Sequence, residues 1–213
     1  MTRLSRLLLT LVVAIAAPAM ALAQTVEPVR AGDRTLGSAD APVTLTVYLS
    51  TTCSHCADWH TRDFPAFKAR FVDTGEVRIA FRDLPTQPQP IAIAGAVMAR
   101  CASEDRYDAV LDALFRGQPL LREPSGAPSQ AVVTRWLGTA GLAGGLTVEQ
   151  MNACMSNEAA FSEVQTRAEQ SFADGVSGTP AFLINGARVP SGSLPAWDVA
   201  AFEPLIQPLL DGR

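Results

Sequence analysis

The sequence lacks a surplus of basic residues: 17 Lys and Arg stand against 21 Asp and Glu, giving a net charge of −4. Nucleic-acid binding depends on a clustered basic surface, so this balance argues against a nucleic-acid partner. No internal repeat and no low-complexity tract is evident. After residue 23, no stretch is long and apolar enough to cross a bilayer. With 48% hydrophobic and 18% charged residues, the composition is typical of one compact soluble domain.

Cysteine is also scarce. The chain has four, at positions 53, 56, 101 and 154, and only one C-x-x-C motif, Cys53-Ser54-His55-Cys56. Structural zinc sites need four ligands and commonly use two such motifs, so the missing second motif argues against one. An even number of cysteines in an exported chain fits a compartment in which disulfides persist.

The first residues predict export. Arg3 and Arg6 precede an apolar run at 7–17, and Ala21-Leu22-Ala23 has the small-x-small form of a cleavage site. We expect a secretory signal peptide over residues 1–23, removed near Ala23, and a periplasmic mature protein. No cysteine follows that site, so no lipid anchor is expected. Without Arg3 and Arg6 the charge becomes 15 minus 21, or −6.

The C-x-x-C lies between two different patterns. Val43–Leu49 is short and rich in β-branched and aromatic residues, which predicts a strand. After the motif, Phe64, Phe67 and Phe71 share one face of a helix expected to run to about Asp73. Cys53 therefore begins a helix, where free N–H groups and the macrodipole favour an anion. Such a position lowers a thiol's pKa, and the thiolate is the form that attacks disulfides.

The rest of the chain predicts an α/β frame interrupted by helices. Residues 24–34 are expected to be an irregular lead-in, and residues 76–81 a second strand. Helical periodicity follows at 90–102, 105–116, 129–140, 147–156 and 158–173. Thr147 with Gln150 fits a capping box, and Asn157 is a further N-cap candidate. We expect breaks at 117–128 and 141–145.

The frame then resumes with a hairpin. Residues 181–184 form a short apolar run, and Asn185-Gly186 is a strong signal for a two-residue turn. Residues 187–190 should return as the partner strand. A last helix is expected over 197–210, with its limits blurred by Pro204 and Pro208.

These features in this order resemble the DsbA-type thiol–disulfide oxidoreductases of the thioredoxin superfamily, over about residues 35–211. The resemblance is carried by short motifs: Leu36-Gly37 with Ala41-Pro42, Cys53-Ser54-His55-Cys56, Phe81-Arg82-Asp83-Leu84-Pro85, Leu114-Phe115 and Gly175-Val176-Ser177-Gly178-Thr179-Pro180. It implies a thioredoxin fold with an inserted all-helical domain. The expected boundaries are 35–86 and 175–213 for the two parts of the thioredoxin fold and 87–174 for the insertion.

The resemblance also implies roles. Cys53 matches the exposed nucleophile, Cys56 the buried resolving cysteine, and Pro180, after Thr179, the cis-proline that faces them. His55 keeps the family's histidine and is expected to tune Cys53, although Ser54 replaces the usual proline. Some family members carry a buried acid six residues before the first cysteine. Here that position is Val47, so the proton acceptor for Cys56 remains unassigned.

Other interpretations stay open. Cys53 and Cys56 could hold zinc or copper with His60 as a third ligand, although His60 suits an ordinary helix position. Cys101 and Cys154 are expected to form a structural disulfide, with two free buried thiols as the alternative. The chain could also be a reductase or isomerase of the same superfamily, or a thioredoxin-like module that only binds a client.

The function expected from the sequence is thiol–disulfide exchange on reduced or unfolded exported proteins, acting as a disulfide donor without a cofactor. A substrate thiolate attacks the Cys53–Cys56 disulfide, and a membrane redox partner resets it. The protein is expected to be a monomer.

Overall fold

The computed structural model describes residues 28–122, 126–190, 192 and 196–212, so the expected signal peptide at 1–23 lies outside the described residues. A five-stranded sheet in the order β1-β3-β2-β4-β5 forms its centre. The strands are β1 Arg34–Leu36, β2 Val43–Leu49, β3 Val77–Asp83, β4 Ala181–Ile184 and β5 Ala187–Arg188.

Strand β2 runs through the middle of the sheet and positions its neighbours. It pairs in parallel with β3 along its whole length, from Val43 opposite Val77 to Leu49 opposite Asp83. On its other side β4 runs antiparallel, with Tyr48 opposite Ala181. The carboxyl end of β2 therefore lies beside the start of β4, although more than 130 residues separate them in sequence.

One face of the sheet is covered by the helix that follows β2. This helix is continuous but not regular: α1 Ser54–Asp58 and α2 Phe64–Phe67 are each followed by a π-helical turn, Trp59–Asp63 and Lys68–Val72. The first π turn ends just before Pro65, whose ring cannot donate a backbone hydrogen bond. Phe64, Phe67 and Phe71 are buried against the sheet as their spacing predicted. Helix α8, Val199–Asp211, packs on the same face through Phe202 and Ile206.

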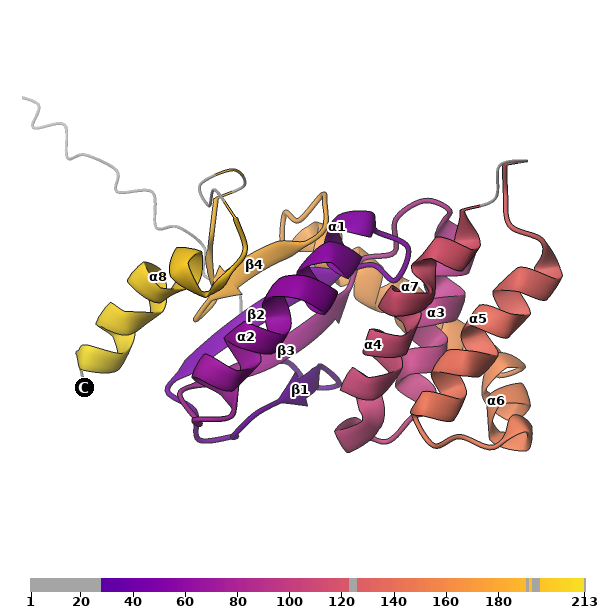
Figure 1. Cartoon of the computed structure of the whole chain (residues 1–213), viewed down its shortest axis with the longest axis horizontal. Coiled ribbons are helices and arrows are strands. Elements are labelled where there is room, and N and C mark those ends of the chain that lie inside the picture. Colours follow the sequence, from indigo (N-terminus) through magenta and orange to yellow (C-terminus); the bar gives the residue numbers. More distant parts are fainter. Residues whose placement is uncertain (1–27, 123–125, 191, 193–195, 213) are drawn as a thin grey trace, which may run out of the picture.

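The helical block between β3 and β4 lies at one end of the sheet (Figure 1). Its helices pack around Trp136, Leu114 and Met98, which are all buried. The elements are α3 Gln89–Cys101, the 3₁₀ turn Glu104–Arg106, α4 Tyr107–Gly117, the 3₁₀ turn Gln118–Leu121, α5 Gln130–Ala143, α6 Val148–Met155 and α7 Glu158–Ala173. Helix α7 leads back and covers the second face of the sheet beside β3.

The structure contains the local features that the sequence predicted most strongly. Thr147 and Gln150 form both hydrogen bonds of the capping box, and the Asn157 side chain caps α7. Asn185 and Gly186 have φ of 48° and 79°, as a type I′ turn requires. The returning strand β5 is shorter than expected, at two residues, and α8 begins at residue 199 rather than 197.

Two element ends differ from expectation. The irregular lead-in was expected through residue 34, but Arg34 begins β1, Arg34–Leu36, which the sequence did not predict and which pairs antiparallel with β3. A break was also expected from residue 141, yet α5 continues to Ala143. Position 141 within this helix has room only for glycine, because a Cβ there would lie 2.1 Å from Met151 Sδ.

The second face of the sheet carries a buried charged network. Arg82 in β3 donates to Asp33 at 3.0 Å and to the Tyr48 hydroxyl at 2.9 Å, and Tyr48 donates to Asp174 at 2.6 Å. Arg100 from α3 donates to Asp83 at 2.6 Å. The network joins the lead-in, the sheet and the insertion, so these parts form one folded unit.

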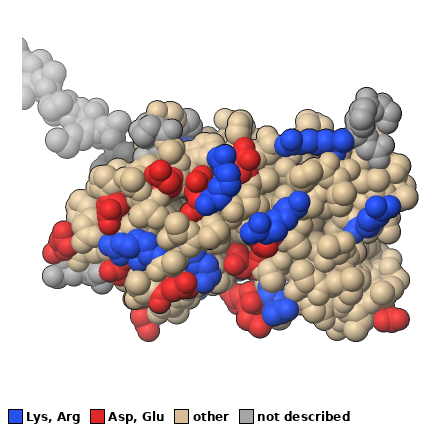
Figure 2. Space-filling view, viewed as in Figure 1, with Lys and Arg blue, Asp and Glu red and all other residues tan. Residues whose placement is uncertain are grey.

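The surface in Figure 2 has acidic and basic side chains interspersed, with uncharged areas between them. This face shows no clustered basic surface of the kind that nucleic-acid binding requires. Among the described helices, none combines the length and apolar character needed to cross a membrane.

Candidate redox site

The reactive turn begins where β2 ends. Ser50, Thr51 and Thr52 leave the sheet, and the Cys53 N–H donates to the Ser50 carbonyl at 3.1 Å. Cys53 then serves as N-cap of α1 in an extended conformation, with φ of −76° and ψ of 121°. The turn therefore places the Cys53 side chain at the start of the helix, as the sequence predicted.

The Ser50 hydroxyl holds this turn against the loop after β3. It accepts from the Thr86 N–H at 3.0 Å, from the Thr86 hydroxyl at 2.9 Å and from the Thr52 N–H at 3.4 Å. Ser50 is only 2% exposed. Because buried donors are costly to leave unpaired, this small hydroxyl fixes two loops at once.

The helical block supports the same turn from the other side. The Gln118 amide nitrogen donates to the Thr51 carbonyl at 2.8 Å and to the Cys53 carbonyl at 3.0 Å, and Gln118 is buried. The Gln118 amide group thus donates both of its hydrogen bonds to the backbone that holds Cys53. Nothing about a glutamine in a predicted break marks it in the sequence, so sequence reasoning missed Gln118, as it missed Ser50.

The Thr179–Pro180 segment closes the site. Antiparallel pairing of β4 with β2 brings it beside the motif, its peptide bond is cis, and Cys53 Sγ lies 3.2 Å from the Thr179 carbonyl oxygen. Cys53 is partly buried, whereas Cys56 is only 1% exposed. The structure thus brings together Cys53, Cys56, Thr179 and Pro180.

The two thiols have opposite acidities. A hydrogen bond from the Cys56 side chain is the largest influence on Cys53; the Thr179 side chain and the N–H groups of Cys56 and His55 act in the same direction. Together they outweigh burial and lower the pKa of Cys53 to about 5. The Thr179 carbonyl favours the protonated thiol, but the donors around the sulfur outweigh it. Burial, followed by the proximity of Cys53, raises the pKa of Cys56 well above its usual value.

His55 is exposed, and its ring meets the edge of Trp197 with ring centroids 6.0 Å apart. Trp197 also packs on Phe182 of β4. Among the largest influences on the Cys53 thiol, His55 contributes its backbone N–H. From the sequence, the His55 ring was expected to tune Cys53. Nothing in the sequence indicated that Trp197 would be the neighbour of His55.

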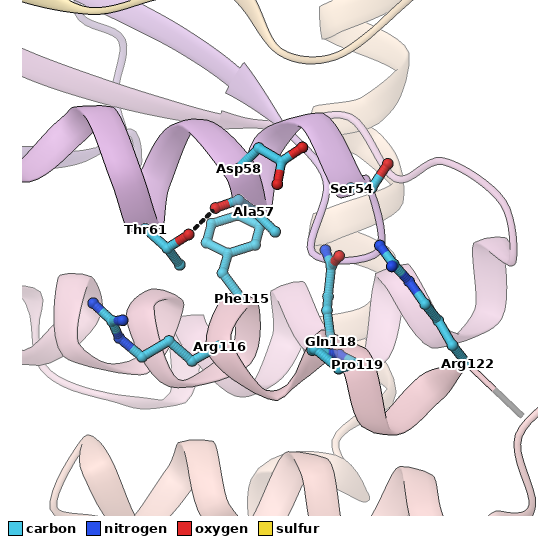
Figure 3. A pocket seen from close by; sticks show the side chains of 9 residues that line it. All are labelled: Ser54, Ala57, Asp58, Thr61, Phe115, Arg116, Gln118, Pro119 and Arg122. Carbon is cyan, nitrogen blue, oxygen red and sulfur yellow. Dashed lines mark hydrogen bonds between the residues drawn. The ribbon is translucent and has the colours of Figure 1, made fainter.

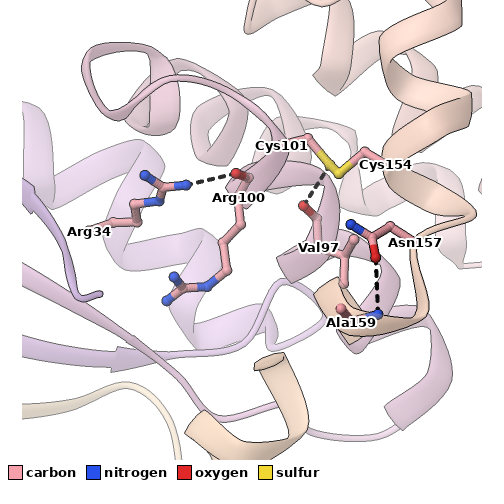
Figure 4. Close-up of a disulfide and its surroundings, with 7 residues drawn as sticks. All are labelled: Arg34, Val97, Arg100, Cys101, Cys154, Asn157 and Ala159. Atoms are coloured by element: carbon pink, nitrogen blue, oxygen red, sulfur yellow. Dashed lines mark hydrogen bonds between the residues drawn. A yellow bond between two sulfur atoms is a disulfide. The ribbon is translucent and has the colours of Figure 1, made fainter. Parts of the chain in front are cut away.

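Cys101 and Cys154 form a disulfide that joins the end of α3 to α6 (Figure 4). The alternative of two free thiols does not describe this structure. Close to the disulfide, Arg34 of β1 donates to the Arg100 carbonyl at 2.7 Å.

His60 lies between Phe64 and Phe115, almost fully buried, with its Nε2 3.7 Å from Asp108 Oδ1. Burial lowers the pKa of His60 to about 4 and raises the pKa of Asp108 to about 6. Asp108 is therefore protonated before His60 as the pH falls, and the two are not an ion pair in acid. Within the described residues, no group of three or more His, Cys, Asp or Glu could hold a metal.

Comparison with known proteins gives matches along most of the chain. A family model described as "Thioredoxin" matches residues 30–200. A protein of Rickettsia bellii named "Putative protein-disulfide oxidoreductase" is 27% identical over 76% of this chain and 60% of its own length. A Rickettsia conorii relative with the same description is 26% identical over 83% of this chain and 62% of its own length. The chain thus spans about 60% of the length of these curated relatives.

Solved structures share the fold. Wolbachia pipientis α-DsbA1 superposes with a TM-score of 0.71 at 20% identity, covering 86% of this chain and 93% of that one. Oxidised BdbD of Bacillus subtilis gives 0.70 at 17% identity, covering 88% and 98%. A protein-disulfide isomerase of Novosphingobium aromaticivorans gives 0.66 at 24% identity, covering 84% and 98%.

Proposed function

The chain belongs to the thioredoxin family, and from this we propose that it is a DsbA-type thiol–disulfide oxidoreductase that donates disulfides to exported proteins. The fold predicted from the sequence, a thioredoxin fold with inserted helices, is confirmed by the likeness to the DsbA structures. The observation that carries the proposal is the contrast between Cys53 and Cys56. One sulfur is accessible with a pKa of about 5, and its partner is buried with a raised pKa.

This contrast assigns an order to the exchange. A substrate thiolate attacks Cys53 of the Cys53–Cys56 disulfide and forms a mixed disulfide, while Cys56 leaves and takes up a proton. A second substrate thiolate then attacks the substrate sulfur, forming the substrate disulfide and releasing Cys53 as a thiolate. Two electrons pass from the substrate to the protein. The low pKa of Cys53 makes it the better leaving group in this second step.

The same acidity supports the donor direction. A pKa of about 5 stabilises the reduced protein at pH 7 by at most about 2.7 kcal/mol, at about 1.4 kcal/mol for each pH unit. Solvent screening of the partly exposed sulfur reduces this figure. In a two-electron couple the upper value corresponds to about 60 mV toward a more oxidising disulfide. A reductase would need the opposite bias.

The surroundings of the reaction are part of the proposal. We place the protein in the periplasm, because residues 1–23 have the pattern of a cleaved signal peptide. We further propose that it acts as a monomer. Its clients would be reduced or unfolded exported proteins. A membrane redox partner would take two electrons from the Cys53–Cys56 dithiol and restore the disulfide.

Single-cysteine variants test the proposal directly. With a reduced, unfolded client, oxidised wild-type protein should restore client activity, and Cys53→Ser should not. Cys56→Ser should accumulate a covalent complex through Cys53, visible on a non-reducing gel and dissolved by reductant. Cys101→Ala with Cys154→Ala is the matched control and should retain exchange. An active Cys53→Ser variant would refute the assignment.

A further inference from the structure

A cavity of about 390 Å³ opens directly beside the reactive cysteine. Residues on both sides of Cys53 line it, together with the loop before α3 and the turn after α4; the lining residues are Thr52, Ser54, Pro88, Gln118, Leu121 and Arg122. A second cavity of about 440 Å³ shares Ser54, Gln118 and Arg122 and continues along the helix toward Thr61 (Figure 3). Any polypeptide bound at Cys53 that extends toward the insertion must pass this opening.

Arg122 is the only charged residue among the described lining residues of the first cavity. Its side chain extends along the wall with the guanidinium beside Ser54 (Figure 3). Within the described parts of the chain, that guanidinium has no ion pair and no hydrogen bond. Arg116, farther along the second cavity, differs because Asp112 binds it at 2.8 Å. Arg122 is therefore the cation available to a bound molecule.

The floor of the cavity is rigid because Gln118 is fixed by its two hydrogen bonds to the backbone of the reactive turn. Those bonds also set the distance between the insertion and Cys53. A group held by Arg122 would therefore lie at a fixed place relative to the reactive sulfur, which is the condition for selecting residues next to a substrate cysteine.

We propose that this cavity receives an acidic side chain of the substrate polypeptide, close in sequence to the cysteine that attacks Cys53. The inference rests on the proposed function and adds a substrate preference to it. A carboxylate matches a guanidinium in shape and charge, and the Ser54 hydroxyl can donate a further hydrogen bond. The chain carries a net charge of −4, so Arg122 supplies a local positive charge on a protein with more acidic than basic residues. A basic residue in the same place would face the Arg122 guanidinium, since the nearest lining carboxylate, Asp58, belongs to the second cavity and not to this one.

The test uses two dithiol peptides that differ only in having Glu or Lys beside the attacking cysteine. Oxidised full-length protein is mixed with each, and disulfide formation in the peptide is followed by acid quench and mass spectrometry. Wild-type protein should oxidise the Glu peptide with a second-order rate constant about two- to fivefold higher, the range of one solvent-exposed ion pair. Arg122→Glu should reverse the preference. Arg135→Glu, an exposed α5 residue away from the cavity, is the matched control and should keep the wild-type ratio.

Two further readouts separate docking from other effects. The preference should shrink in high salt. The Cys53 titration near pH 5 should be unchanged in Arg122→Glu, because Arg122 is not among the groups that set that pKa. An unchanged Glu-to-Lys ratio in Arg122→Glu would overturn the inference. If wild-type protein oxidised neither peptide, the proposed function itself would fail.

Discussion

The redox equilibrium of Cys53 and Cys56 should depend on pH in a way that the structure sets. Cys53 has a folded-state pKa of about 5, below its ordinary value, so its ionisation stabilises the reduced protein. That stabilisation is present above pH 5 and is lost as the pH falls through 5. The Cys56 thiol, with its raised pKa, stays protonated over the same range.

The size of the effect can be worked out against glutathione, whose thiol has an ordinary pKa and stays protonated below about pH 8. Reduction of the protein disulfide by two glutathione molecules releases about one proton above pH 5 and none below it. The equilibrium constant should therefore rise about tenfold for each pH unit above 5 and become flat below it. From pH 5 to pH 7 the rise is about 50-fold, since Cys53 is already half ionised at pH 5.

The assay equilibrates the protein with glutathione mixtures at pH 4 to 7.5, quenches with acid, alkylates the free thiols and weighs the fragment that contains Cys53. Thr179→Val provides a matched variant: it keeps the backbone carbonyl and removes a hydroxyl donor to the thiolate, so the bend should move to higher pH. An equilibrium constant that stayed constant from pH 5 to pH 7 would show that Cys53 is not ionised there. The reasoning on donor direction would then fail with it.

Four variants should change stability. Cys101→Ala with Cys154→Ala should lower the free energy of unfolding by up to about 4 kcal/mol, the chain-entropy value for a separation of 53 residues, as measured by urea denaturation. Arg82→Met should cost roughly 3–5 kcal/mol in the same assay because it leaves the buried Asp33 carboxylate without this partner; a loss under 1 kcal/mol would contradict that. His60→Phe should make stability rise as the pH falls from about 6 to 4, because only the raised pKa of Asp108 remains to act. Asp108→Asn should make stability fall as the pH drops from about 6.5 to 4, because the lowered pKa of His60 then acts without Asp108. Identical pH profiles for the two variants would refute the opposite pKa shifts of His60 and Asp108.

The parts of the fold that the sequence predicted are those with strong local signals. The capping box at Thr147, the turn at Asn185-Gly186 and the apolar run at Val43–Leu49 each restrict the backbone locally. Strand β1 has three residues and exists because β3 offers an open edge, which no local pattern reports. Gly141 resembles a helix end in sequence, yet it lies inside α5, where the nearby Met151 leaves no room for a Cβ.

The sequence predicted the chemical groups of the candidate site but not the residues that hold them in place. Cys53, Cys56, Thr179 and Pro180 belong to short motifs that resembled a known family. Gln118 holds the reactive turn from 65 residues away along the chain, as a polar residue in a segment without periodicity. Such contacts arise from tertiary packing, and a single sequence carries no record of them.

The distance in sequence between Cys53 and Thr179 has a consequence for biosynthesis. A chain delivered from its N-terminus presents Cys53 126 residues before Thr179 arrives. Until then the thiols lack the Thr179 hydroxyl donor, and before residue 118 emerges their turn lacks the Gln118 support. The full acidity of Cys53 therefore needs the segment just before β4, so a chain that ends before Thr179 carries the motif without that acidity. Docking of the Thr179 segment, and not synthesis of the motif, completes the reactive site.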